Sequence, residues 1–213
     1  MPPTLSLAGV GVTRSGTTIL RYVDLTVEPG EVVGVTGPNG TGKTTLLRVA
    51  ATLLIPATGT ATVLGADVGT ADARSIRPRI GLVGHRPAGA PHLTVAEQLG
   101  LWADLADIDR GDTDRALAAV GLANAADRRG TELSAGMARR ADLARVVLTR
   151  PDLLLLDEPD AGLDAEATPI VDALCSATTR RGGSALVVSH DPDRVARLCD
   201  RMVRIVDGHL EAA

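Results

Sequence analysis

The sequence contains no phenylalanine, one tryptophan and one tyrosine among 213 residues, although 45% of its residues are hydrophobic. The core must therefore consist of leucine, valine, isoleucine and alanine, a composition typical of buried parallel strands covered by helices. Proteins that bind single-stranded nucleic acid usually stack bases on aromatic side chains, and proteins held mainly by phosphate contacts are basic. The shortage of aromatic residues and the net charge of −4 both argue against nucleic acid as a partner.

Cysteine is also scarce, because only Cys175 and Cys199 occur, far apart and without the spacing of a metal site. We expect two reduced thiols in the core or on the surface of a cytosolic protein. The N-terminus lacks a basic segment followed by an apolar run, so no signal peptide is expected. No uncharged apolar run is long enough to cross a bilayer, so a role at a membrane would require a partner that spans it.

The hydrophobic pattern predicts one domain over residues 1–213, with a core of 1–83 and 149–213 and an inserted helical subdomain at about 84–148. The four-leucine run before Asp157 is too short for a helix and favours a buried central strand. A hairpin is expected around Asp207-Gly208. The pattern predicts strands over residues 4–12, 18–27, 31–37, 59–65, 79–84, 152–157 and 184–190, and helices over 44–54, 93–106, 112–122 and 133–150.

The segment from Gly37 to Thr44 matches the phosphate-loop pattern G-x-x-x-x-G-K-[ST], between an expected strand and an expected helix. The glycines allow backbone N–H groups to surround phosphates, and the helix N-terminus adds a favourable dipole. Lys43 is expected to reach the β- and γ-phosphates, Thr44 to ligate Mg²⁺, and Thr45 to lie near the α-phosphate. A chance glycine-rich turn is the alternative. The expected nucleotide-binding residues are Gly37, Pro38, Asn39, Gly40, Thr41, Gly42, Lys43, Thr44 and Thr45.

Two acidic residues follow the leucine-rich strand. Asp157, at the carboxyl end of that strand, is placed to hold Mg²⁺ directly or through water. Glu158 can point at the γ-phosphate and act as the general base for an attacking water. A solvent-exposed acidic pair is the alternative, which the complete phosphate loop disfavours.

Three further motifs make the chain resemble the ABC-type ATPases. "LSAGM", residues 133–137, is similar to the family signature "LSGGQ", and "AGLD" ends in Asp164, which matches the aspartate of the D-loop. "VVSHD" carries His190, which matches the catalytic switch histidine. The five motifs occur in the family's order over essentially the whole chain. The resemblance implies ATP and Mg²⁺ as ligands and an α/β fold: a P-loop NTPase (RecA-like) core with a mostly parallel sheet, an antiparallel β subdomain and an inserted helical subdomain.

The resemblance gives a function to an unusual helix start, in which Ser134 is the expected N-cap and glycine weakens the first turn. In ABC ATPases two copies pack head to tail, and the signature of each caps the γ-phosphate held by the other. Ser134, Ala135 and Gly136 are therefore expected to contact the ATP of a second subunit, with the side chains at 135 and 136 kept small. A plain helix cap is the alternative.

Some family positions carry other residues. His85 lies where the glutamine of the Q-loop is expected, four residues after Gly81, and it can contact Mg²⁺-bound water or the γ-phosphate. An ordinary loop histidine is the alternative. Arg14 lies where an aromatic residue stacks on adenine, and a guanidinium plane can also stack there. Ala135 and Met137 replace the first glycine and the last residue of the signature.

The resemblance implies the ATPase subunit of a membrane transporter, bound peripherally at the cytoplasmic side of the cell membrane. Its expected partners are integral membrane permease subunits and a second ATPase subunit, expected to be another copy of the chain. "GHRPAGAPHLTVAEQL", "LSAGM" and Arg14 are similar to the ATP-binding subunit of the haem exporter of cytochrome c maturation. A soluble ABC-type ATPase, such as one of iron-sulfur cluster assembly, is the alternative. A P-loop kinase would lack the last three motifs, and Glu158 and His190 disfavour a non-catalytic nucleotide sensor.

Overall fold

The leucine run at 153–156 forms an interior strand of a six-stranded sheet and is buried on both faces of that sheet. In the computed structural model, which describes residues 1–163 and 167–212, this run is strand β7 (Leu153–Asp157). Leu153 and Leu155 belong to one hydrophobic cluster, whereas Leu154 and Leu156 belong to another. Because successive side chains of a strand point to opposite faces, a strand between two cores has a continuous apolar sequence.

The central sheet also contains β3 (Val32–Thr36), β6 (Ile80–Val83), β8 (Ser184–Val188), β9 (Arg201–Val206) and β10 (His209–Ala212). Its strand order is β10-β9-β3-β8-β7-β6, and the pairs are parallel except in the β9–β10 hairpin. The carboxyl ends of β3, β8 and β7 therefore lie side by side at one edge. The predicted mostly parallel sheet and C-terminal hairpin are confirmed.

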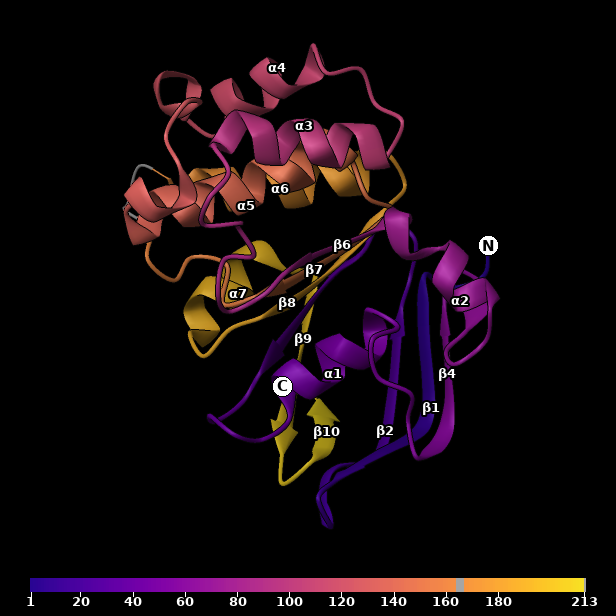
Figure 1. Ribbon diagram of the computed structural model, residues 1–213. Coiled ribbons are helices and arrows are strands. Elements are labelled where there is room, and N and C mark those ends of the chain that lie inside the picture. The colour runs from indigo at the N-terminus through magenta and orange to yellow at the C-terminus, as the bar shows by residue number, and fades with distance from the viewer. Residues whose placement is uncertain (164–166, 213) are drawn as a thin grey trace.

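A second sheet is antiparallel, as predicted. It contains β1 (Leu5–Arg14), β2 (Thr17–Val27), β4 (Thr58–Val63) and β5 (Ala66–Asp67), in the order β2-β1-β4-β5. Helix α1 (Lys43–Ala50) lies between the two sheets (Figure 1). Its buried leucines share one cluster with strands of both sheets, so α1 is held from two sides.

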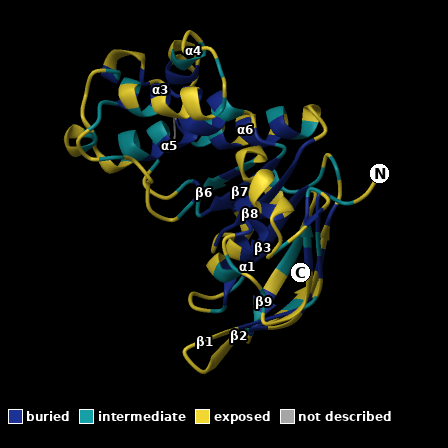
Figure 2. Ribbon diagram, turned by 45° about the vertical axis from the view of Figure 1, so that its right-hand side comes forward, coloured by how far each residue is buried: buried dark blue, intermediate teal, exposed yellow. Residues whose placement is uncertain are grey.

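Helices cover the other face of the central sheet. Figure 1 shows α3, α4, α5 and α6 as a layer over β6, β7 and β8, and Figure 2 shows that their outer surfaces are exposed. This layer shares the second hydrophobic cluster with the sheet. Besides α1, the described residues form α2 (Asp72–Ser75), α3 (Val95–Leu105), α4 (Asp112–Ala119), α5 (Ala135–Thr149), α6 (Thr168–Arg180) and α7 (Pro192–Leu198). They also form 3₁₀ turns at Arg77–Arg79, Ala123–Ala125 and Gly130–Glu132.

One expectation about a helix was wrong, and some helices were missed. The helix predicted over 44–54 ends at Ala50, because Thr52 adopts a left-handed backbone with φ of 58° and is held there by Arg77. The Arg77 guanidinium donates to Thr52 Oγ1 at 3.0 Å and to Thr52 O at 2.9 Å. Helices α2, α6 and α7 were not predicted. Threonine and β-branched residues are frequent in α6 and lower its helix propensity, so packing against the sheet decides its conformation.

No helix in the two described stretches is long and apolar enough to cross a membrane. Cys175 is buried and Cys199 is half-buried, and both are free thiols, as predicted. Burial raises the pKa of each thiol to about 12, so both stay protonated at neutral pH.

The close packing of α7 on β3 generates a stability prediction. A Cβ added at Gly34 would overlap Val195 Cγ1 and lie 3.1 Å from Cys199 Sγ, and Val195 is fully buried. Gly34→Ala should therefore lower the free energy of unfolding by about 1–3 kcal/mol. A Cβ at Gly100, inside α3, meets its nearest atom at 3.6 Å. Gly100→Ala is the control, because it should raise the free energy of unfolding by about 0.5–1 kcal/mol. Urea titrations measure both changes, and equal effects would contradict the packing explanation.

Candidate functional site

The predicted phosphate loop joins β3 to α1 and leaves the start of that helix open. Gly42, the N-cap of α1, has a left-handed backbone with φ of 110° and provides no capping side chain. The first N–H groups of a helix have no partner within the helix, and together with the helix dipole they favour a bound anion. Glycine is required at Gly37, because φ is 145° and a Cβ would lie 2.5 Å from Ile205 O. The loop therefore has the backbone of an anion-binding turn.

Lys43 is folded into this loop. Its side-chain Nζ donates to Gly37 O at 2.6 Å and to Pro38 O at 3.0 Å, and the residue is buried. The ammonium group is therefore held beside the open helix start, where it adds positive charge to the anion site. Lys43 is also the only lysine in the sequence.

Thr44 and Asp157 come together from α1 and β7. Thr44 Oγ1 donates to Asp157 Oδ2 at 2.8 Å, and Asp157 is buried. In the part of the chain that the structure describes, no group of three or more His, Cys, Asp and Glu residues could hold a metal ion. A hydroxyl and one carboxylate suit Mg²⁺, which usually takes one or two carboxylates and completes its shell with water and substrate phosphates. These two residues fit a magnesium ion that arrives with a phosphate ligand.

Glu158 follows Asp157 and has a left-handed backbone, with φ of 50°. Its Oε2 lies 2.8 Å from His190 Nδ1 and accepts a hydrogen bond from Ser189 Oγ at 3.2 Å. Ser189 was not predicted as a site residue. Its position directly after β8, at the edge where β7 also ends, is the feature that would have indicated it.

A cavity of about 490 Å³ connects these side chains. Residues from segments far apart in the sequence line it, including His85 from the loop after β6. Arg14 is exposed at the end of β1 and is not among the lining residues, whereas Ile19 of β2 is. The lining residues are Ile19, Asn39, Gly40, Gly42, Lys43, Thr44, Thr45, His85, Asp157, Glu158, Ala161 and His190.

A buried arginine of α5 holds the His85 backbone in place. Arg139 donates from Nη1 to Gly84 O at 2.6 Å and from Nη2 to His85 O at 2.8 Å. Burial lowers the pKa of this guanidinium, while the nearby Asp142 acts in the opposite direction. Arg139 was not predicted, although a basic residue on the buried side of a helix indicates such a tether.

The predicted signature segment lies away from this cavity. Ser134 is the N-cap of α5 and accepts a hydrogen bond from Met137 N at 3.2 Å, so it acts as a helix cap within its own chain. Gly136 must be small for a reason that the sequence did not indicate, because a Cβ there would lie 2.9 Å from Gly162 O. None of residues 134–136 lines the cavity, and Asp164 lies outside the described residues.

Comparisons with known proteins agree with this geometry. Residues 20–161 match the family model described as ABC transporter. The chain is 37% identical to the phosphate import ATP-binding protein PstB 2 of Natronomonas pharaonis, over 97% of this chain and 78% of that protein. It is 39% identical to the cytochrome c biogenesis ATP-binding export protein CcmA of Bradyrhizobium diazoefficiens, over 83% of this chain and 86% of that protein.

A solved structure supports the same relationship. The dimeric structure of an ATP-binding cassette in a post-hydrolysis state, bound to ADP and Pi, aligns with a TM-score of 0.87 and 25% identity, covering 98% of each chain. The predicted fold class, with its P-loop core, is therefore confirmed.

The single lysine allows a direct test of the loop. An amine-reactive acetylating reagent can modify only Lys43 and the N-terminal amine of Met1, which is fully exposed. Saturating Mg-ATP should slow the modification of Lys43 at least about tenfold, because the ligand-bound fraction is protected. Labelling of Met1, read by peptide mass mapping in the same sample, should stay unchanged. Equal labelling of Lys43 with and without ATP would remove this lysine from the binding site.

Proposed function

The chain belongs to the ABC transporter family and is an ATP-binding subunit with ATPase activity, and from this premise we propose how it works. Two copies enclose two ATP molecules, and ATP binding and hydrolysis drive a separate membrane subunit. The convergence of Lys43, Asp157, Glu158 and His190 on one cavity is the observation that supports the catalytic part of this proposal.

The hydrolytic step uses side chains that are already placed. Lys43 and the open N-terminus of α1 bind the phosphates, and Thr44 and Asp157 would hold Mg²⁺, which neutralises phosphate charge when bound. Glu158 takes the proton from the attacking water. His190 donates from Nδ1 to the Glu158 carboxylate and so orients it, the two atoms being 2.8 Å apart. His85, which lines the same cavity, would contact the γ-phosphate or Mg²⁺-bound water.

Dimerisation completes the site. Within one chain, the residues that line the cavity bind the triphosphate. The signature residues 134–136 of that chain do not line this cavity. The start of α5, with Ser134, Ala135 and the first N–H groups of the helix, therefore binds the ATP of a second copy. The dimeric state of the similar cassette supports this arrangement.

The membrane partner binds at a groove between α3, α5 and the loop after His85. The groove has a volume of about 520 Å³. Leu101, Trp102 and Leu105 on α3 are exposed, and Trp102 also lines the groove. Two buried polar atoms there, Arg139 Nε and Asp142 Oδ2, have no hydrogen-bond partner among the described residues. These two atoms are shielded from solvent, so the exposed apolar side chains beside the groove are what favour docking, and a partner segment with apolar groups fits this surface.

The membrane partner, rather than this chain, determines which substrate is transported. The relatives above include the ATP-binding protein of an importer and that of an exporter, at similar identity. Export for cytochrome c biogenesis is the narrower candidate, supported by the 39% identity to CcmA. The two named relatives belong to transport systems, which favours a peripheral position at the cytoplasmic side of a membrane over cluster assembly.

Replacing the proposed base tests the catalytic assignment. Glu158→Gln keeps the size of the side chain but removes its basicity, so ATP turnover should fall roughly 10²–10⁴-fold while ATP affinity is retained. Phosphate release and titration with a fluorescent ATP analogue measure the two quantities. Near-normal turnover would exclude Glu158 as the base.

A charge at Ala135 tests the dimer. In the Glu158→Gln background, the chain with ATP should elute as a dimer in size-exclusion chromatography. Ala135→Glu adds a carboxylate at the first position of α5, where it stabilises its own helix by about 0.3–1 kcal/mol but repels the γ-phosphate of the other copy. This variant should stay monomeric and still bind ATP, whereas the neutral control Ala135→Gln should dimerise. A dimer that survives Ala135→Glu would leave Ser134 as a helix cap alone.

A further inference from the structure

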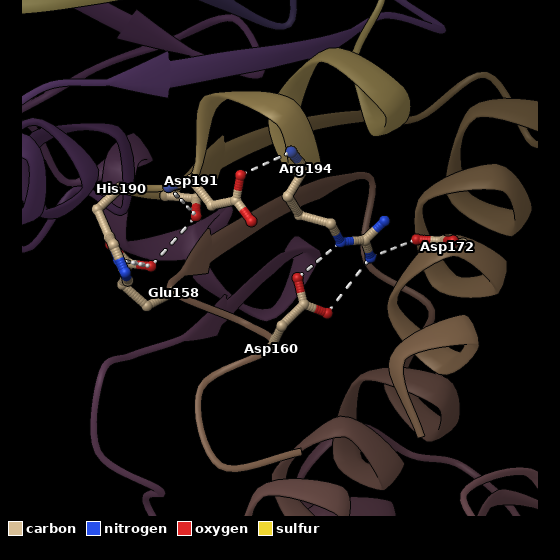
Figure 3. A network of polar contacts seen from close by, with 7 residues as sticks. Glu158, Asp160, Asp172, His190, Asp191 and Arg194 are labelled. Carbon is tan, nitrogen blue, oxygen red and sulfur yellow. Dashed lines mark hydrogen bonds and ion pairs between the residues drawn. The ribbon is translucent and has the colours of Figure 1, made fainter. Parts of the chain in front are cut away.

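A charged cluster outside the cavity connects both segments that position Glu158. Its centre is Arg194 of α7, whose side chain is largely buried (Figure 3). The guanidinium donates from Nε to Asp160 Oδ2 at 2.8 Å and from Nη2 to Asp160 Oδ1 at 3.3 Å. Nη2 also donates to Asp172 of α6. Arg194 therefore ties the segment after Glu158 to two helices.

This cluster is a firm attachment rather than a surface ion pair. Burial lowers the pKa of the Arg194 guanidinium, but its hydrogen bonds to Asp160 and then Asp172 more than offset this effect, and the pKa is raised. A bidentate arginine–carboxylate pair fixes both distance and orientation, because the two planar groups match. A buried guanidinium that lost Asp160 would remain charged and poorly solvated.

Two paths of hydrogen bonds lead from this attachment to Glu158. Along the chain, Asp160 lies two residues after Glu158, and Ala161 N donates to Glu158 O at 3.0 Å. Through α7, Arg194 N donates to Asp191 Oδ1 at 3.0 Å, and Asp191 N donates to Ser189 Oγ at 3.1 Å. Ser189 Oγ in turn donates to Glu158 Oε2. The contacts form a closed ring from the backbone of Glu158 back to its carboxylate, and Figure 3 shows the bonds of Arg194 to Asp160 and to Asp191.

The ring holds a residue that needs support. Glu158 has a φ of 50°, a left-handed conformation that is unfavourable for a residue with a side chain and persists only where the surroundings enforce it. Within the ring, Arg194 holds Asp160, and neither residue lines the cavity. A shift of Asp160 would therefore change both the Glu158 backbone and the loop at 189–191.

We propose that Arg194 is a positioning residue for hydrolysis, which holds Glu158 and the 189–191 loop in one arrangement through its bidentate bond to Asp160. The proposal rests on the role of Glu158 proposed above. Arg194 is not among the residues that line the cavity. The bond to Asp172 anchors α7 to α6 and lies outside the ring. Because the rate of attack falls steeply when a reacting group is misplaced, small movements of Glu158 reduce turnover without weakening ATP binding.

The test compares matched variants of the full chain in steady-state ATPase assays. Arg194→Met removes the guanidinium at similar length, and Asp160→Asn keeps the shape of the partner but removes its charge. Both should lower kcat about tenfold, with KM for ATP and the affinity for a fluorescent ATP analogue within about twofold of the original. Arg197→Met, at an exposed arginine of the same helix, is the control and should leave kcat unchanged.

Two further readouts separate positioning from general stability. Arg194→Lys should recover part of the lost kcat, and the Asp160→Asn/Arg194→Met double variant should lose no more than Arg194→Met alone, because both changes break one bond. Asp172→Asn should lower the melting temperature but leave kcat within about twofold. Equal losses of kcat in Asp172→Asn and Asp160→Asn, or additive losses in the double variant, would reduce the cluster to a structural role. If Arg194→Met does not fold, Asp160→Asn alone decides.

Glu158→Gln, measured in parallel, distinguishes the two proposals. If Glu158→Gln loses turnover but Arg194→Met and Asp160→Asn keep their kcat, the positioning role is wrong and the proposed function stands. If Glu158→Gln itself keeps turnover, both proposals are wrong, because the ring then holds a residue that is not the base.

Discussion

Parallel pairing of three strands that are buried on both faces, β3, β7 and β8, is the constraint on which the rest of the site depends. Asp157 at the end of β7 pairs with Val188 at the end of β8, and Val188 pairs with Val35 of β3. The phosphate loop, the acidic pair and the 189–191 loop therefore begin at one edge of the sheet. A shift of one residue in this register would turn Asp157 to the other face, away from Thr44.

Arginine, rather than lysine, connects this edge to the helices. The sequence has 22 basic residues, of which Lys43 is the only lysine. Arg139 and Arg145 of α5 donate to backbone carbonyls of residues 82, 84 and 85 after and within β6, and Arg194 of α7 joins Asp160 to Asp172. A planar guanidinium can bridge two acceptors at once, so each of these residues fixes a relative position and not only a distance. In this fold the lysine lies in the phosphate loop, where it is proposed to bind the ligand, and the arginines connect the segments around the site.

Helix α5 has a central place in this arrangement. Its N-terminus carries Ser134 and Ala135, which are proposed to reach a second copy, while Arg139 on the same helix holds the backbone of His85. Gly136 packs against the carbonyl of Gly162, in the segment that follows Glu158. A rigid-body shift of α5 would therefore act on the proposed dimer contact, on His85 and on this segment together. The proposed groove for a membrane partner lies along the same helix. A movement of α5 caused by the proposed partner would therefore reach the proposed nucleotide site through these few contacts.

The sequence by itself determined the strands of both sheets except the two-residue β5, and also the phosphate loop and the residue pair Asp157-Glu158. These features depend on local rules: apolar runs for strands buried on two faces, glycines for a turn with positive φ, and short motifs in a set order. Only the tertiary structure decided which distant residues meet. The end of α1 depends on Arg77, and the conformation of α6 depends on the sheet against which it packs. The ring around Glu158 depends on Arg194, which lies 36 residues later in the sequence. Such contacts leave no periodic pattern, because their energy comes from pairing a buried charge with partners that the fold brings to it.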